Sequence, residues 1–249
     1  MTVVKPHKTK ASPLSNITPG LAFSHCFSAI LFAFLCAHAL KIKQVRDELG
    51  FYWIYHSHPM NQLVHFFFVP TLLWTSSIYF VHLELANITI SLPFIPTHRI
   101  NHSTIWMSFF AVLYTSLDPV GGALYLPILY FFHYGSAVWL HERDQRASKY
   151  RSWNGTGKLL QWAFLVHVGS WAIQIWAHQH YENGRPALMD SLAQSLTIAP
   201  LFAFYEGLWS LGINGPLKQH TLEQAEILTK NFCSSDSLMN VCQIFPSTS

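Results

Sequence analysis

The stretch LLQWAFLVHVGSWAIQIWAHQHYE, residues 159–182, joins an apolar run to two histidines and an acid, and it sets the expected fold class. Apolar runs of similar character recur along the chain, at residues 21–40, 63–81, 104–117, 123–140 and 191–213. A membrane-spanning helix needs roughly 20 mainly apolar residues, so the longest runs can cross a bilayer, whereas the shorter ones can tilt or re-enter. The sequence therefore predicts an all-α, polytopic helical membrane bundle with about five or six membrane segments.

The composition also favours a membrane protein. Of the 249 residues, 51% are hydrophobic and 11% are charged, whereas about a quarter of the residues of soluble domains are charged. The formal net charge of +3 is too small a basic excess to indicate a nucleic-acid partner. The four cysteines form no C-x-x-C pair, so they match neither a zinc motif nor a disulfide framework.

A first polar cluster lies in FYWIYHSHPMNQLVHFFFVP, residues 51–70, at the entrance of an apolar run. Pro59 suits the first position of a helix. In that helix Asn61 and His65 are four residues apart and share one face, because neighbours at this spacing lie one turn apart. His56 is expected on a turn just before the helix. The cluster therefore brings imidazoles and an amide to the start of a membrane segment.

A second polar cluster follows one face of the 159–182 helix, at His167, Ser170, Gln174, His178 and Glu182. His180 is two residues from His178 and points nearly opposite, so the two should not share a ligand sphere. His167 lies three turns before His178, about 16 Å away at the standard rise, and cannot bind the same ion. Polar groups in membrane helices usually face the bundle interior. The pattern thus selects His178 and Glu182.

Together the two clusters can form a nitrogen-rich site for a divalent transition metal, because imidazole is a good ligand for Fe, Zn, Cu and Ni. The candidate ligands are His56, His65, His178 and Glu182, with His58 as an alternative to His56. The competing interpretation is a non-catalytic transporter or scaffold, in which the same groups only make hydrogen bonds or line a proton or metal pathway.

A further alternative comes from His98 and His102, which have the H-x-x-x-H spacing of membrane di-iron hydroxylases and desaturases. Enzymes of that kind carry additional boxes such as H-x-x-H-H and take electrons from a reductase. The sequence contains no such additional box. This alternative is therefore poorly supported.

The two segments at 51–70 and 174–212 resemble the fungal 2-hydroxy fatty acid dioxygenases of the endoplasmic reticulum, which act in phytosphingosine breakdown. The resemblance covers roughly Leu49 to Leu217. Two positions depart from the family pattern: Ala177 stands where a glycine is usual, and Ser57 where close relatives can carry a second histidine. The matching positions are Tyr55, His56, Asn61, His65 and Pro70, then His178, Glu182, Arg185, Pro186, Ala187, Leu188, Gln194, Ser195, Pro200 and Glu206.

The resemblance implies an Fe(II)-dependent dioxygenase that shortens a long-chain 2-hydroxy fatty acid by one carbon with release of CO2, a step of fatty acid α-oxidation. Converting R–CHOH–COOH to R–COOH and CO2 releases four electrons and O2 accepts four, so no reductase partner is expected. His56, His65 and His178 would hold Fe2+, and Glu182 would be either a fourth ligand or the base for the 2-hydroxyl. Arg185 would pair with the substrate carboxylate.

The remaining site residues implied by the resemblance lie around this centre. Asn61 and Tyr55 are expected to contact the substrate beside Arg185. Asn61, Gln174 and Glu206 are expected to orient the imidazoles through their far nitrogens, as residues behind metal ligands commonly do. The expected partners are therefore a 2-hydroxy fatty acid, O2 and the lipid bilayer, with no nucleic acid.

The resemblance also implies a multi-pass protein of the endoplasmic reticulum membrane and suggests a division of the chain. A dioxygenase domain is expected over the matching part, preceded by an additional helix and flanked by irregular ends. The expected parts are a disordered N-terminus (1–20), an extra helix outside the resemblance (21–48), the dioxygenase domain (49–217) and a C-terminal tail (218–249).

Overall fold

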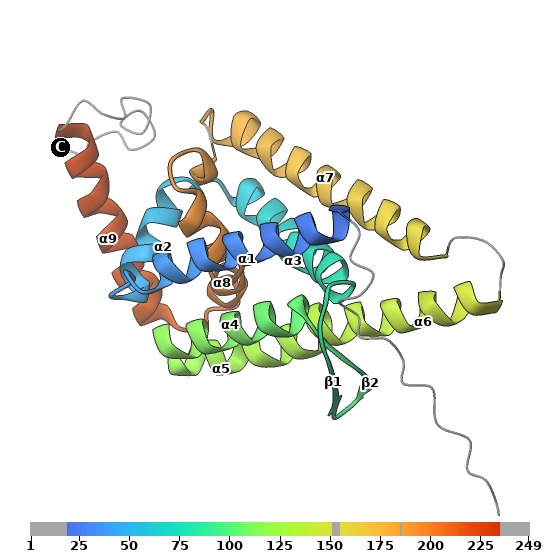
Figure 1. Cartoon of the computed structure of the whole chain (residues 1–249). Coiled ribbons are helices and arrows are strands. Elements are labelled where there is room, and N and C mark those ends of the chain that lie inside the picture. Colours follow the sequence, from blue (N-terminus) through green and yellow to red (C-terminus); the bar gives the residue numbers. More distant parts are fainter. Residues whose placement is uncertain (1–18, 151–154, 185, 235–249) are drawn as a thin grey trace, which may run out of the picture.

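The computed structural model describes residues 19–150, 155–184 and 186–234, and it confirms the predicted all-α bundle (Figure 1). The first 18 residues of the segment predicted to be disordered, and Arg185, lie outside the described residues. In chain order the elements are α1 (Pro19–Ala39), α2 (Val45–Ile54), α3 (Pro59–Val81), β1 (Glu84–Leu92), β2 (Ile95–Asn101), α4 (His102–Leu117), α5 (Pro119–Pro127), the π-helix η2 (Ile128–Gly135), α6 (Ser136–Tyr150), α7 (Gly155–Tyr181), the 3₁₀ turn η3 (Ala187–Met189), α8 (Leu192–Ser210) and α9 (Gly215–Ser234).

Helix α3 is the centre of the bundle. Helix α7 packs along it, and α8 and α6 cover further parts of its surface. Helix α2 lies between α8 and α9, and α4 pairs with α5. In Figure 1, α1 crosses in front of the bundle, where it contacts α8 and α4. This arrangement brings the start of α3 and the end of α7, which carry the two polar clusters, to the same end of one helix pair.

Three of the described segments are long and apolar enough to cross a membrane: α1, α3 and the continuous helical stretch Pro119–Ala147. Their outer faces carry large apolar side chains, among them Phe23 at 71% and Val120 at 71% exposure. Such groups would be costly in water and are well suited to contact with lipid tails. These helices identify a membrane protein.

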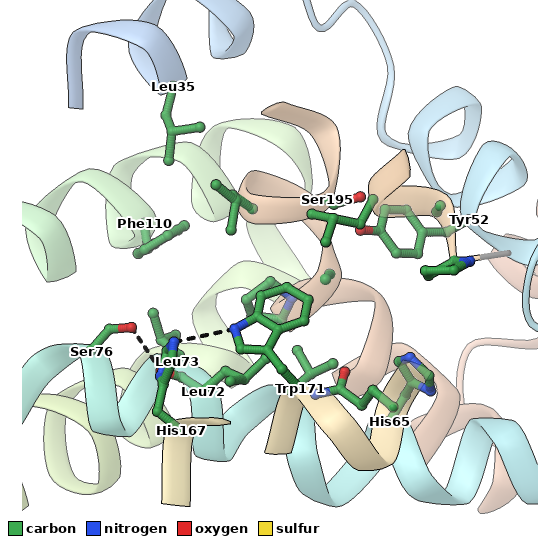
Figure 2. Close-up of a pocket in the computed structure, with 18 of the residues that line it drawn as sticks. Leu35, Tyr52, His65, Leu72, Leu73, Ser76, Phe110, His167, Trp171 and Ser195 are labelled. Carbon is green, nitrogen blue, oxygen red and sulfur yellow. Dashed lines mark hydrogen bonds between the residues drawn. The ribbon is translucent and has the colours of Figure 1, made fainter. Parts of the chain in front are cut away.

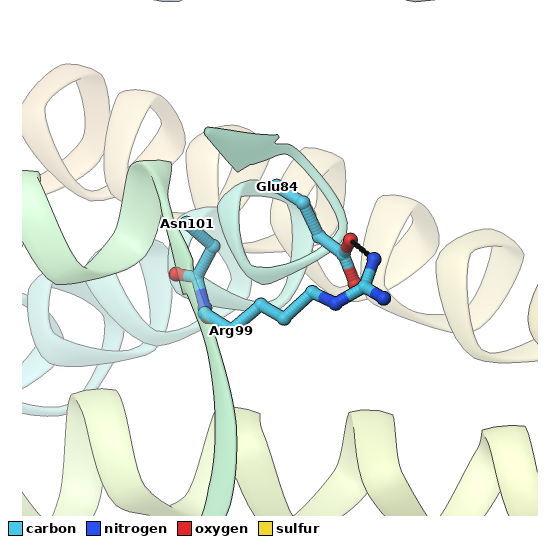
Figure 3. A network of polar contacts seen from close by, with 3 residues as sticks. All are labelled: Glu84, Arg99 and Asn101. Carbon is cyan, nitrogen blue, oxygen red and sulfur yellow. Dashed lines mark hydrogen bonds and ion pairs between the residues drawn. The ribbon is translucent and has the colours of Figure 1, made fainter. Parts of the chain in front are cut away.

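A β-hairpin, formed by β1 and β2, occupies the region between α3 and α4. The two strands are antiparallel and irregular in register, and Phe94 has a positive φ of 61° at the turn. An ion pair of 2.7 Å between Arg99 and Glu84 joins the strand ends (Figure 3). The side chain of Asn101 then caps α4 by accepting a hydrogen bond from the N–H of Thr104.

Local signals fix the two helix ends that form the site. Pro59 is the first residue of α3, and the His58 side chain caps the helix by accepting from the N–H of Met60 at 3.1 Å. At the end of α7, Asn183 adopts a left-handed φ of 49°, a conformation that asparagine tolerates better than most residues. Both helix ends are therefore set by residues next to the candidate ligands.

Candidate metal centre

Three imidazoles from the two clusters converge in the interior. His56 comes from the turn before α3, His65 from the second turn of α3, and His178 from the last turn of α7. One ligand atom from each ring lies within 4.8 Å of the other two. The ring centroids are 4.4 Å apart for His56 and His65, 4.9 Å for His56 and His178, and 4.7 Å for His65 and His178. All three side chains are buried, so the cluster is shielded from solvent.

Backbone carbonyls set the orientation of two of these rings. The Nδ1 of His56 donates to the carbonyl of Tyr52 at 2.9 Å, and the Nδ1 of His65 donates to the carbonyl of Asn61 at 2.9 Å. A carbonyl only accepts, so each neutral ring keeps a free lone pair on Nε2. The buried Nε2 of His56 has no hydrogen-bond partner among the described residues. This is the arrangement that metal-bound histidines adopt, and the donor set fits a divalent transition metal.

The protonation state of His56 also suits a ligand. This residue lies in a turn outside the candidate membrane helices. Burial, and to a smaller extent the neighbouring His178 imidazole, lowers the pKa of His56 to about 3. The ring is therefore neutral at physiological pH, which is the form that binds a metal.

The Glu182 carboxylate binds the turn that carries His56. Its Oε2 accepts from the Ser57 hydroxyl at 2.6 Å, and its Oε1 accepts from the backbone N–H of His58 at 2.8 Å and from Nδ2 of Asn61 at 3.1 Å. Buried carboxylates are stable when several donors surround them. Glu182 thus holds the end of α7 against the start of α3, beside the imidazole cluster rather than within its set of grouped ligand atoms.

Asn61 also connects the turn that carries His56 to the end of α7. Its amide nitrogen also donates to the carbonyl of Tyr55 at 3.2 Å and lies 3.4 Å from Nδ1 of His178. The Tyr55 hydroxyl donates to Asp190 at 2.9 Å, between α2 and the loop before α8. Asn61 therefore lies directly behind a candidate ligand, whereas Tyr55 fixes the loop that follows α7.

The other residues expected in the site are Gln174, Glu206 and Arg185, and each has a different environment. Gln174 lies one turn before His178, where its amide donates to the carbonyl of Ser170 at 3.0 Å. Glu206 on α8 is buried at 8% exposure, and neither carboxylate oxygen has a hydrogen-bond partner among the described residues. Arg185 lies outside the described residues. Ser57 and Asp190 were not recognised from the sequence, because their roles depend on partners more than 120 positions away.

His58, the alternative to His56, stacks on Tyr181 at a centroid distance of 4.9 Å. His180, which the helical geometry set aside, stacks on Trp176 at 4.9 Å on the outer side of α7. His167 pairs with the hydroxyl of Thr75 at 2.8 Å. These rings lie outside the cluster of His56, His65 and His178.

The two histidines of the H-x-x-x-H pattern, His98 and His102, have different partners. His98 on β2 pairs with the hydroxyl of Tyr134, while Nε2 of His102 at the start of α4 lies 2.8 Å from Nδ1 of His25. They therefore form no common ligand set among the described residues.

An elongated cavity of about 320 Å³ opens from the imidazole cluster along the groove between α3 and α7 (Figure 2). In α3 the lining runs from His65 to Phe80, a span of about 22 Å at the standard helical rise. In α7 it runs from His178 back to His167. Apart from a few polar groups, apolar side chains line it, so its shape and surface suit a hydrocarbon chain with a polar head at the histidines.

Comparisons with known proteins identify relatives of this chain. Residues 42–210 match the family described as 2-hydroxy-palmitic acid dioxygenase Mpo1-like. The chain is 30% identical over 187 residues to the 2-hydroxy-palmitic acid dioxygenase MPO1 of Saccharomyces cerevisiae, an alignment that covers 75% of this chain and 92% of the yeast protein. No solved structure matches.

Proposed function

The chain belongs to the family of Mpo1-like 2-hydroxy-palmitic acid dioxygenases, and from this premise we propose that it is an Fe(II)-dependent dioxygenase that shortens long-chain 2-hydroxy fatty acids by one carbon. The observation that carries the proposal is the convergence of His56, His65 and His178 at one end of a long apolar cavity. A catalytic pocket of this kind places the head of an acyl substrate at the metal and its tail between the helices.

In this proposal His56, His65 and His178 would hold Fe2+. Ferrous iron, when bound, would supply the activation of O2 for attack on the 2-hydroxy acid. The backbone contacts of His56 and His65 keep their lone pairs directed at the centre. Asn61 and Glu182 keep the two contributing segments together. The protein's part in the chemistry is thus to fix the ligands and to exclude water.

The overall reaction balances without another reductant. R–CHOH–COOH and O2 give R–COOH, CO2 and H2O, with cleavage of the bond between C1 and C2. Four electrons leave the substrate and four enter O2. The proposed partners are accordingly the 2-hydroxy fatty acid, O2 and the bilayer, with no reductase. We place the reaction in fatty acid α-oxidation and phytosphingosine degradation at the endoplasmic reticulum membrane. The yeast relative is a 2-hydroxy-palmitic acid dioxygenase, which supports the class of substrate.

We expect the purified protein to convert 2-hydroxypalmitate into the fatty acid with one carbon fewer, given Fe2+ and O2 alone. Mass spectrometry of the product and CO2 release measure the reaction, and a metal-stripped sample is the control. A strict requirement for NAD(P)H and a reductase would contradict the proposal and indicate a di-iron hydroxylase instead. Bound metal without turnover on any 2-hydroxy acid would favour a transporter or scaffold.

We further propose that Arg185 binds the substrate carboxylate. It stands between the end of α7 and Pro186, and Pro186, Ala187 and Leu188 line the cavity. An arginine fork binds a carboxylate through two parallel hydrogen bonds.

Arg185→Ala is therefore expected to raise KM for 2-hydroxypalmitate about 10–100-fold while bound iron is unchanged. Arg185→Lys should recover part of the loss, because it restores charge but not the planar fork. Steady-state kinetics and iron analysis measure both quantities. A folded Arg185→Ala protein without iron, or one with unaltered KM, would contradict this role.

A further inference from the structure

One wall of the cavity comes from α1, a helix that precedes residue 42, where the family match begins. Phe27, Leu31 and Leu35 line the cavity. They are spaced four residues apart, so they form one stripe along a single face of the helix. In Figure 2, Leu35 and Phe110 lie across the cavity from Leu72 and Leu73 of α3. A chain lying in the cavity must therefore pass between α3 and α1.

Another face of α1 is turned outward. Ile30 is 70% exposed, whereas Leu35 is 1% exposed, and Phe27 at the end of the lining stripe is 55% exposed. A helix in this position separates the cavity from the lipid on its outer side. The three lining side chains consequently limit the width of the space available to a substrate.

Polar contacts hold α1 at a defined position. The hydroxyl of Ser28, which is fully buried, pairs with Nδ1 of His102 at 2.7 Å and accepts from Nε1 of Trp106 at 3.1 Å. The ring of Phe32 packs edge-on against Trp106 at a centroid distance of 5.7 Å. Hydrogen bonds within an apolar bundle fix the rotation of a helix, because a turned helix would leave these groups unpaired. The same face of α1 therefore remains toward the cavity.

The dimensions of the cavity are close to those of an acyl chain. The volume is about 320 Å³ and the lining extends about 22 Å along α3, so the cavity is long and narrow. A cavity this narrow responds to the addition of a few atoms, since packed interiors do not absorb extra volume without strain.

We propose that α1 selects the acyl chain length of the substrate, with Phe27, Leu31 and Leu35 setting how much of the chain the cavity accepts. This inference rests on the proposed dioxygenase function. It adds a specificity-determining element from a part of the chain outside the family match.

The first test compares Leu31→Trp with Ile30→Trp, which adds the same indole to the outward face of the same helix. Activity is measured on 2-hydroxy acids of 8 to 24 carbons. Leu31→Trp should shift the preferred length downward by about two carbons or more and raise KM for 2-hydroxypalmitate about 10-fold or more, with activity on the shortest acids retained. Ile30→Trp should keep the wild-type profile. Identical profiles for the two variants would overturn the proposal.

A second test does not depend on turnover or on the folding of a variant. A 2-hydroxy fatty acid with a photoreactive diazirine along its chain is cross-linked to the wild-type protein, with and without excess 2-hydroxypalmitate. Adducts that the competitor removes should fall on Phe27, Leu31 or Leu35, whereas adducts on Ile30 should persist as labelling from the lipid side. Competed adducts confined to other helices would overturn the proposal. If the proposed dioxygenase function is wrong, the wild-type protein gives no turnover on an acid of any chain length. That outcome is distinct from the results that would overturn the role of α1.

Discussion

Replacing His178 by alanine is expected to abolish turnover, with a loss of at least about 1000-fold, and to remove most of the bound iron. His178 is buried and its ring lies 4.9 Å and 4.7 Å from the rings of His56 and His65. Two imidazoles alone hold a divalent ion much more weakly, because each ligand removed costs a coordinate bond. Iron analysis of the purified protein and product formation from 2-hydroxypalmitate measure the two effects.

His180→Ala is the matched control, since it removes the same ring two residues away on the same helix. His180 is exposed and stacks on Trp176 outside the cluster. We expect this variant to keep most of its iron and activity. His167→Ala, whose ring binds Thr75, should keep its iron. Equal damage from His178→Ala and His180→Ala would mean that the three-histidine centre is not the site of the reaction.

Replacing Glu182 by alanine is expected to have the second-largest effect. The variant leaves the Ser57 hydroxyl, the His58 N–H and the Asn61 amide without their common acceptor. Unsatisfied buried donors of this kind cost about 3 kcal/mol of stability in total. The turn that carries His56 loses its support, so iron affinity should fall about 10–100-fold, as it does when residues behind a metal ligand are removed.

Glu182→Gln distinguishes the possible roles of this residue. The glutamine carbonyl can still accept from His58 and Asn61, and its amide can donate to Ser57, so the positioning contacts survive without a charge. If Glu182 acts by positioning, this variant should retain its iron and keep activity within about 10-fold of wild type. A variant that holds iron but is as inactive as Glu182→Ala would show instead that the carboxylate acts as a base. Loss of iron with retained thermal stability would identify it as a ligand.

Much of this centre could be predicted from the sequence, because helical periodicity determines which residues share a face. The spacing of Asn61 and His65 and the position of Pro59 were sufficient to place one half of the cluster. The separation of His178 from His180 followed from the same geometry. All of these are relations within one turn or two of a single helix.

Long-range relations could not be obtained in this way. The turn before α3 brings His56 inward and uses His58 as a helix cap, a choice that depends on how α7 docks. The contacts of Glu182 with Ser57 and of Tyr55 with Asp190 join segments with no local pattern in common. The hairpin between α3 and α4 and the cavity wall from α1 likewise depend on packing, which hydrophobic periodicity does not specify.

The hydrogen bond between Ser57 and Glu182 joins residues 125 positions apart in the sequence. This separation has a consequence for the order in which the protein is assembled. A nascent chain that has emerged only as far as α6 contains His56 and His65 but not His178. Any ion that needs all three nitrogens can therefore be captured only after α7 has been synthesised and has docked on α3. In the proposed three-histidine centre, metal loading would consequently be a late maturation step that follows the synthesis and docking of α7.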